Sequence, residues 1–132
     1  MSTSDKDVVK AFVDAFARGD IDTALGYLAP DSLVDEADGL EFSGKYHGPD
    51  GFQKLLTTMG SRLEATVDGC DYVVGDDGVI ITKMALTFSS RATGRKLPTR
   101  VTELYTVKNG RIAHLDSFYK DPAGVAALYA EN

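Results

Sequence analysis

The stretch "TRVTELYTVKNGRIAHLDSFYKD", residues 99–121, is the part of the sequence that decides the fold. Apolar and polar residues alternate on both sides of Asn109-Gly110, a dipeptide typical of a tight turn between antiparallel strands. The alternation places Glu103 on the same face as Val101 and Tyr105, which is the more apolar face. The sequence therefore predicts a long β-hairpin that directs a carboxyl group toward the protein interior.

Two pairings of this hairpin are open from the sequence. A two-residue turn would place Glu103 opposite Asp116, whereas a three-residue loop would place it opposite Leu115. In the second pairing Ser117 and Tyr119 share the face of Glu103, and Asp116 points away from it. The pattern of side chains favours this second, shifted pairing.

The rest of the chain changes from a helical period to a period of two. We expect a first helix over residues 7–18, a second helix that begins at Asp20 and ends before Pro30, and a third helix that begins at Pro49. A loop is expected over residues 36–48. Strands are expected over residues 32–36, 64–74, 79–90, 96–108 and 111–120, followed by a short helix after Asp121-Pro122. This order predicts an α+β domain spanning residues 1–132, with helices on one face of a curved, mostly antiparallel sheet.

Composition narrows the class of protein. The chain has 132 residues, 43% of them hydrophobic and 26% charged, which is the composition of one ordinary globular domain. Its net charge of −6 argues against nucleic acid and against an anionic membrane surface as partners. The polar start of the chain and the lack of a long apolar run predict a cytoplasmic location.

The residues that hold metals and cofactors are sparse. Cys70 is the single cysteine, and His47 and His114 lie too far apart for a zinc-ligand pattern. Glycine-rich phosphate loops and nucleophile-elbow motifs are absent from the sequence. We therefore expect neither a metal nor a cofactor.

Three segments carry a family resemblance: "ARGDIDTALGYLAPDSLVDE" (17–36), "GKYHGPDGFQKLL" (44–56), and "TGRKL" (93–97) with "YTVKNGRIAHLDSFYKDP" (105–122). Together they resemble the NTF2-like superfamily, and within it the SnoaL-like and ketosteroid-isomerase-like proteins. The resemblance implies a cone-shaped sheet of the cystatin/NTF2-like kind wrapped around N-terminal helices, and a homodimer formed through the outer sheet face. Residues implied near that interface are Arg100, Thr102, Leu104, Ile112, His114 and Phe118.

The resemblance also implies roles for individual positions. The catalytic base falls on Glu36 and a neutral carboxylic acid on Glu103, a pairing that ketosteroid isomerase uses with two Asp residues. The catalytic phenol of that family falls on Phe12, and its supporting aromatic positions fall on Leu28 and Leu56. The strand acid of SnoaL-like cyclases, seven residues after the hairpin glycine, falls on Ser117.

These observations lead to two functional hypotheses. The first is a cofactor-independent enzyme that isomerises, cyclises or eliminates a small apolar molecule such as a polyketide or terpenoid, with Glu36 as base and Glu103 as acid. The second is a non-catalytic module that binds an apolar ligand or dimerises. The residues expected to contact the substrate are Phe12, Phe16, Tyr46, Met59, Met84, Phe88, Tyr105, Leu115, Ser117 and Tyr119.

Overall fold

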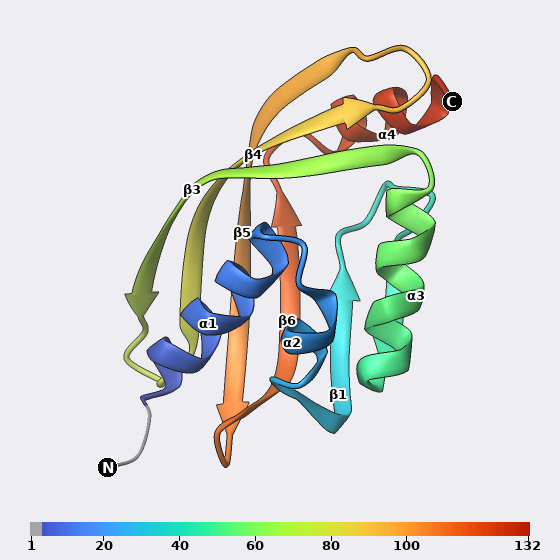
Figure 1. Cartoon of the computed structure of the whole chain (residues 1–132). Helices are drawn as coiled ribbons and strands as arrows, with labels where there is room; N and C mark the ends of the chain where they lie inside the picture. The colour runs from blue at the N-terminus through green and yellow to red at the C-terminus, as the bar shows by residue number, and fades with distance from the viewer. Residues whose placement is uncertain (1–3) are drawn as a thin grey trace.

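The fold is a six-stranded curved sheet whose concave face is covered by helices (Figure 1). The computed structural model describes residues 4–132. Its elements are α1 (Asp5–Ala17), α2 (Ile21–Leu25), β1 (Leu28–Glu36), β2 (Gly44–His47), α3 (Gly48–Gly60), β3 (Leu63–Val74), β4 (Ile80–Ser90), β5 (Lys96–Lys108), β6 (Arg111–Tyr119) and α4 (Pro122–Ala130). The predicted α+β cone of the NTF2-like kind is confirmed.

The strand order is β2-β1-β6-β5-β4-β3, and only the β1–β6 pair is parallel. The long strands β3, β4 and β5 bend around α1, while α3 lies beside β1 and α4 lies at the far end of the sheet (Figure 1). Because the concave side faces α1 and α3, every second residue of each strand points into the space between sheet and helices.

The helices begin and end where the sequence supplies capping groups. The Ser4 side chain accepts the backbone N–H of Asp7 at the start of α1, and Gly19 follows the helix at φ 77°. The Asp20 side chain accepts the N–H of Thr23 at the start of α2. These capping hydrogen bonds satisfy backbone N–H groups in the first turns of both helices.

Two expectations for the region after α1 are wrong. Helix α2 ends at Leu25 rather than running to Pro30, and β1 already begins at Leu28. Pro30 is tolerated because it lies in the irregular part of β1, before the regular ladders with β2 and β6 begin at Leu33. Strand β2 lies inside the expected loop; its four residues pair only with β1 at the edge of the sheet.

The turn of the β5–β6 hairpin is the two-residue type. Lys108 pairs with Arg111, and Asn109 and Gly110 both have positive φ, at 53° and 76°. Two successive positive φ angles are the backbone signature of the type I′ turn that Asn-Gly favours. The expected three-residue loop is therefore wrong.

The register nevertheless shifts two residues beyond the turn. Val107 pairs with Ile112 but Thr106 pairs with His114, so Ala113 is an extra residue that forms a β-bulge. Beyond the bulge Glu103 pairs with Ser117, a partner that neither expected register gave. The bulge restores the face predicted by the shifted register, since Leu115, Ser117 and Tyr119 all line the concave side.

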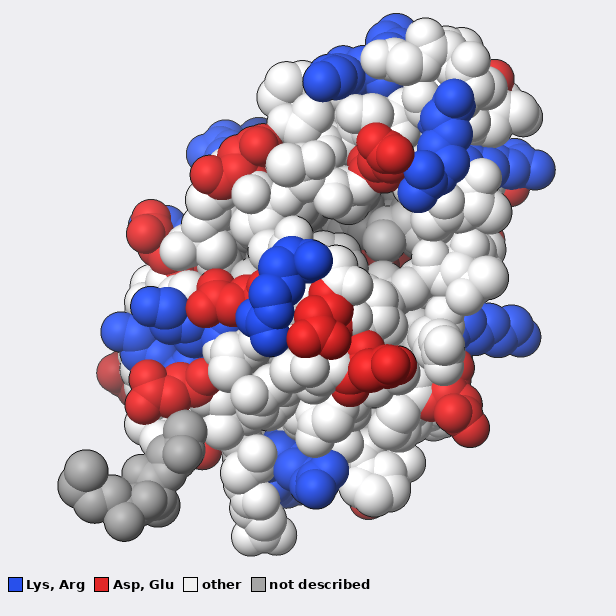
Figure 2. All heavy atoms as spheres, viewed as in Figure 1, with Lys and Arg blue, Asp and Glu red and all other residues white. Residues whose placement is uncertain are grey.

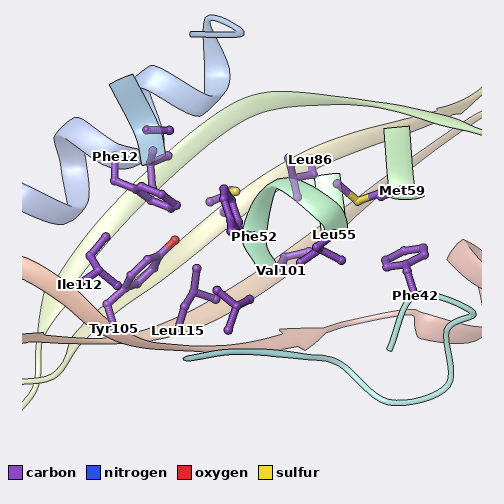
Figure 3. Close-up of a cluster of buried hydrophobic side chains, with 14 of the residues drawn as sticks. Phe12, Phe42, Phe52, Leu55, Met59, Leu86, Val101, Tyr105, Ile112 and Leu115 are labelled. Carbon is purple, nitrogen blue, oxygen red and sulfur yellow. The ribbon is translucent and has the colours of Figure 1, made fainter. Parts of the chain in front are cut away.

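The same bulge corrects the position of Ile112. We expected this residue on the outer face, but its side chain is fully buried beside Tyr105 in the core (Figure 3). The extra residue in the bulge interrupts the simple alternation of faces along β6. Ile112, which precedes the bulge, therefore points to the inner face, although regular alternation from Leu115 would place it on the outer face. Phe118, in contrast, lies on the outer face and is 51% exposed.

Apolar side chains of α1 and α3 pack against the concave face of the sheet and complete the core. The buried cluster includes Phe12, Phe52, Leu55 and Met59 from the helices, which pack over Val101, Tyr105 and Leu115 of the sheet (Figure 3). Within residues 4–132, none of the helices is both long enough and apolar enough to cross a membrane.

Candidate active site

A cavity of about 60 Å³ lies between the concave face of the sheet and helices α1 and α3. A hollow opens at the surface near the C-terminal half of α3, below β3 (Figure 2). The cavity is lined by Phe12, Val13, Phe16, Val34, Glu36, Phe52, Leu55, Leu56, Met59, Ala65, Met84, Leu86, Phe88, Val101, Glu103, Tyr105, Leu115, Ser117 and Tyr119. Its volume suits a few water molecules and is well below the ~300 Å³ of the smaller ligand pockets.

Strand register places the two carboxyl groups in the same row of inward-facing side chains across β1, β6 and β5. Glu103 of β5 pairs with Ser117 of β6. On the other side of β6, Val34 of β1 pairs with Leu115, so the next inward residues on these two parallel strands are Glu36 and Ser117. Glu36 and Glu103 are thus separated by one strand, a backbone distance of roughly 10 Å.

Glu103 is the more strongly perturbed of the two acids. Burial raises its pKa to about 7 from 4.5, the hydroxyl of Tyr105 lowers it by donating a hydrogen bond, and the nearby Glu36 raises it. The Tyr105 Oη to Glu103 Oε1 distance is 2.8 Å. Glu103 is only partly exposed and lines the cavity, and desolvation is the largest cause of the shift. Near neutral pH this group can both give and take a proton.

Glu36 has a different set of partners. Burial raises the pKa of its carboxyl group, while the backbone N–H of Ala37, at 2.9 Å, and the hydroxyls of Ser117 and Tyr119 lower it. The Ala37 N–H donates to this carboxylate and the nearby hydroxyls of Ser117 and Tyr119 also favour its ionised form, whereas Glu103 has one side-chain donor, Tyr105. The two environments separate the acids into a better base, Glu36, and a better acid, Glu103.

Aromatic rings form the walls on both sides of the acids. Phe12 packs against Phe52 at a ring separation of 5.4 Å and edge-on against Tyr105 at 5.9 Å. Phe88 and Tyr119 stack with their centroids 5.9 Å apart. Phe12 occupies the position where the resemblance places a catalytic phenol, and the phenol nearest to it, Tyr105, already donates its hydrogen to Glu103.

The structure brings nearly all of the predicted contact residues together. Both acids and nine of the ten expected contact residues line the cavity. The exception is Tyr46, which is outside the lining and donates its hydroxyl to the carbonyl of Phe42 at 2.8 Å. His47 is exposed at the start of α3. His114 lies on the outer face of β6, away from the cavity lining.

Sequence reasoning missed several apolar lining residues. They are Val13, Val34, Phe52, Leu55, Leu56, Ala65 and Val101. A signal for them existed, because the helical stripe of α3 and the alternation of β1 and β4 mark the buried face. The sequence does not reveal which of the buried residues line the cavity and which are packed on all sides.

Side chains that bind metals do not gather in the cavity. Among residues 4–132 there is no group of three or more His, Cys, Asp or Glu side chains placed to hold a metal ion. Cys70 and Tyr72 lie on β3 outside the cavity lining, and burial raises the pKa of both groups. The polar side chains that do line the cavity are suited to proton transfer and hydrogen bonding.

The sequence of the chain is similar to that of a known protein family. The sequence profile of the SnoaL-like domain matches residues 9–115, most of the chain. The chain belongs to the SnoaL-like family. A relative in Mycobacterium tuberculosis, the uncharacterized protein Rv0034, is 32% identical over 129 residues, which cover 96% of this SnoaL-like chain and 97% of the relative.

Solved structures share the fold of this SnoaL-like protein. An NTF2-like protein of unknown function from Burkholderia pseudomallei superimposes with a TM-score of 0.86 at 20% identity, covering 97% of this chain and 98% of that one. A proposed polyketide cyclase from Xanthomonas campestris gives a TM-score of 0.79 at 21% identity, with 92% and 93% covered. TerC, co-crystallized with polyporic acid, gives 0.83 at 15% identity, with 94% and 96% covered.

Proposed function

We propose that this SnoaL-like protein is a cofactor-independent enzyme that moves protons on a small, largely apolar molecule. The reaction class is isomerisation, cyclisation or elimination, and the substrate is of polyketide or terpenoid type. The observation that carries the proposal is a pair of carboxyl groups, the buried Glu36 and the partly buried Glu103, that line the same apolar cavity. Acids with different environments at one site are the usual basis for dividing base and acid roles.

The roles follow from the hydrogen bonds. Glu36, whose carboxylate accepts the Ala37 N–H and lies near the hydroxyls of Ser117 and Tyr119, takes a proton from carbon adjacent to a carbonyl or similar group. Glu103, with a pKa of about 7, donates its proton to the oxygen on which negative charge develops. Returning the proton from Glu36 to another carbon and from the oxygen to Glu103 completes an isomerisation with no net change in the enzyme.

The structural neighbours support this class of substrate at the level of the fold. One neighbour is a proposed polyketide cyclase and another was crystallised with polyporic acid. In this chain, the cavity must enlarge before a ring-containing molecule fits, because only about 60 Å³ is free. Leu56 and Phe16, which are partly exposed at the cavity wall, are the side chains best placed to move.

Isomerisation of cyclohex-3-enone to cyclohex-2-enone tests this proposal with a small probe. The product absorbs more strongly in the ultraviolet than the substrate because its double bonds are conjugated, and exchange in D₂O detects enolisation even when isomerisation is slow. We expect Glu36→Gln and Glu103→Gln each to reduce the rate at least ~100-fold, the usual scale of acid–base catalysis. Asp116→Asn, which removes a carboxyl group from the opposite face of β6, is the matched control and should keep full activity.

The proposal would be contradicted if the wild-type protein exchanged the hydrogens of cyclohex-3-enone with D₂O no faster than buffer alone does. So would full activity in both glutamine variants. Either result would favour the second candidate, a ligand-binding module without turnover. That candidate draws on one specific observation: Phe12 stands where the family resemblance places a phenol, and the hydroxyl of Tyr105 is already engaged by Glu103.

We also propose that the protein is a homodimer through the outer face of the sheet. Phe118 is 51% exposed at this face, beside Thr102 of β5 and close to Lys83, Arg100 and Lys120. Asp35 and Asp116 are paired neighbours on the same face. A two-fold axis would let the basic end of one subunit meet the acidic end of the other.

A further inference from the structure

The cavity has an imbalance between hydrogen-bond donors and acceptors. Its polar lining consists of Glu36, Glu103, Tyr105, Ser117 and Tyr119. The Tyr105 hydroxyl donates to Glu103, and the hydroxyls of Ser117 and Tyr119 lie close enough to Glu36 to lower its pKa. An ionised carboxylate can accept about four hydrogen bonds, so the spare capacity of the cavity is mostly acceptor capacity. A ligand therefore has to supply donors.

The cavity also has an imbalance of charge. Among the described residues, none of the side chains that line it is Lys, Arg or His. The side chains contributed by α1 and α3 are all apolar, so both acidic groups lack a cationic partner inside the cavity. A buried carboxylate without a partner is costly, and a cation beside it removes much of that cost.

The aromatic walls complete the environment that a cation prefers. Six of the lining residues are aromatic, and the Phe12–Phe52–Tyr105 and Phe88–Tyr119 groups come from both helices and sheet. The faces of such rings attract ammonium groups, most strongly where water is excluded. The cation–π pair that the structure itself contains, Arg62 over Tyr129, lies outside this cavity.

We propose that the cavity selects small apolar molecules that carry a protonated amine, with the ammonium group beside Glu36 and Glu103 and the hydrocarbon part against the aromatic rings. The inference rests on the proposed function in placing a ligand in this cavity. It adds a ligand class that the ionised form of Glu103 binds, whereas the proposed reaction uses the protonated form. An anion is excluded by the two acids. A neutral carbonyl compound finds a donor only when Glu103 is protonated.

A matched set of three probes tests the inference: isobutylamine, isobutanol and isobutyrate. They share one hydrocarbon skeleton and differ in the group presented to the acids. Binding is measured at pH 6 and pH 8 by protein-observed NMR titration and by the shift of the thermal unfolding midpoint. An alkylammonium with a pKa of ~10 stays protonated across this range, so any pH dependence reports the protein.

At pH 8 we expect isobutylamine to bind at least tenfold more tightly than isobutanol, and isobutyrate not to bind. The titratable groups that face the cavity are Glu36 of β1, Glu103 and Tyr105 of β5, and Tyr119 of β6, with Cys70 and Tyr72 of β3 close to Glu103. Glu103, at a pKa of about 7, is the group that titrates within this window. Its ionised fraction falls from ~0.9 to ~0.1 between pH 8 and pH 6, so amine affinity should fall roughly ninefold.

Variants locate the site and separate this inference from the proposed reaction. Glu103→Gln should lose most of the preference for amine over alcohol and its pH dependence, Glu36→Gln should weaken the preference, and Asp116→Asn should retain it. Equal binding of alcohol and amine at pH 8, or an amine preference unchanged in both glutamine variants, would overturn the inference. If cyclohex-3-enone is turned over while the amine preference is absent, only this inference fails and the proposed reaction stands.

Discussion

Replacing Glu103 by glutamine should stabilise the protein, and more so as the pH rises. In the folded state the pKa of Glu103 is about 7, against 4.5 for an unperturbed Glu. The folded protein therefore binds a proton more tightly than the unfolded chain, and the free energy of unfolding falls as pH rises between these two values. The penalty is absent below pH 4.5 and fully present above pH 7. Glutamine removes it because its amide is neutral at every pH.

The size of the effect follows from the shift. A difference of 2.5 pKa units corresponds to about 3.4 kcal/mol at high pH, of which about 2.5 kcal/mol develops between pH 5 and pH 8. For a domain of this length that amounts to a difference of roughly 10 °C in the midpoint of thermal unfolding. The substituted amide would still offer an oxygen to the hydroxyl of Tyr105, so the packing around the site is retained.

The assay is urea unfolding of the wild-type protein and of Glu103→Gln at half-unit steps from pH 5 to pH 8. The stability difference between them should grow by about 2.5 kcal/mol, with no change in the dependence on urea. Glu36, whose pKa is also raised, acts in both proteins and largely cancels from the difference. For the control Asp116→Asn we expect a difference that stays within about 0.5 kcal/mol. A constant difference between wild type and Glu103→Gln would show that the carboxyl group is not desolvated.

Four further outcomes are expected. The rate on cyclohex-3-enone should fall as pH rises above about 7, where Glu103 loses the proton it donates, and this alkaline decline should vanish in Glu103→Gln; a decline that persists there would assign it to another group. Phe52→Ala should cost about 3–5 kcal/mol in chemical unfolding by removing a buried ring that packs on Phe12, whereas the exposed neighbour Gln53→Ala should cost little; equal costs would mean that the ring is not packed. Gly110→Ala should cost about 1–2 kcal/mol because φ is 76°, while Gly60→Ala, free of contacts, should be neutral or stabilising; a neutral Gly110→Ala would argue against the positive φ. Phe118→Asp should halve the mass measured by analytical ultracentrifugation if the outer face is the dimer interface. The control Val74→Asp, an exposed residue of β3 on the opposite face of the sheet, should not; an unchanged mass for Phe118→Asp would place the interface elsewhere.

Much of the fold could be predicted because its signals are local. Period-two alternation located β3 to β6 within a residue or two, and the predicted cap at Asp20 lies where α2 begins. Strand β2 escaped because its residues, Gly44–His47, show no apolar alternation at a sheet edge. Pro30 led to a wrong prediction for the end of the second helix. Proline also fits in a strand where the neighbouring strand needs no N–H from that residue, and this depends on tertiary structure.

The candidate site shows the same division. Parity placed Glu103 on the inner face, and family resemblance singled out Glu36. The partner of Glu103 in the ladder was missed because the Ala113 bulge leaves no clear mark in the sequence. The hydrogen bond from Tyr105 to Glu103 was within reach, since residues two apart on a strand share a face, but its length and the volume of the cavity depend on packing.

The cavity draws its reactive atoms and its shape from different parts of the chain. Every polar group in it stands on β1, β5 or β6, where backbone ladders fix the spacing, while α1 and α3 add only hydrocarbon and sulfur. Exchanging Phe16, Leu56 or Met59 would therefore change which molecules are admitted while the proton-handling groups keep their geometry. Such a scaffold lets ligand preference diverge through a few helix substitutions, and an engineer could use the same route to move this protein between ligands.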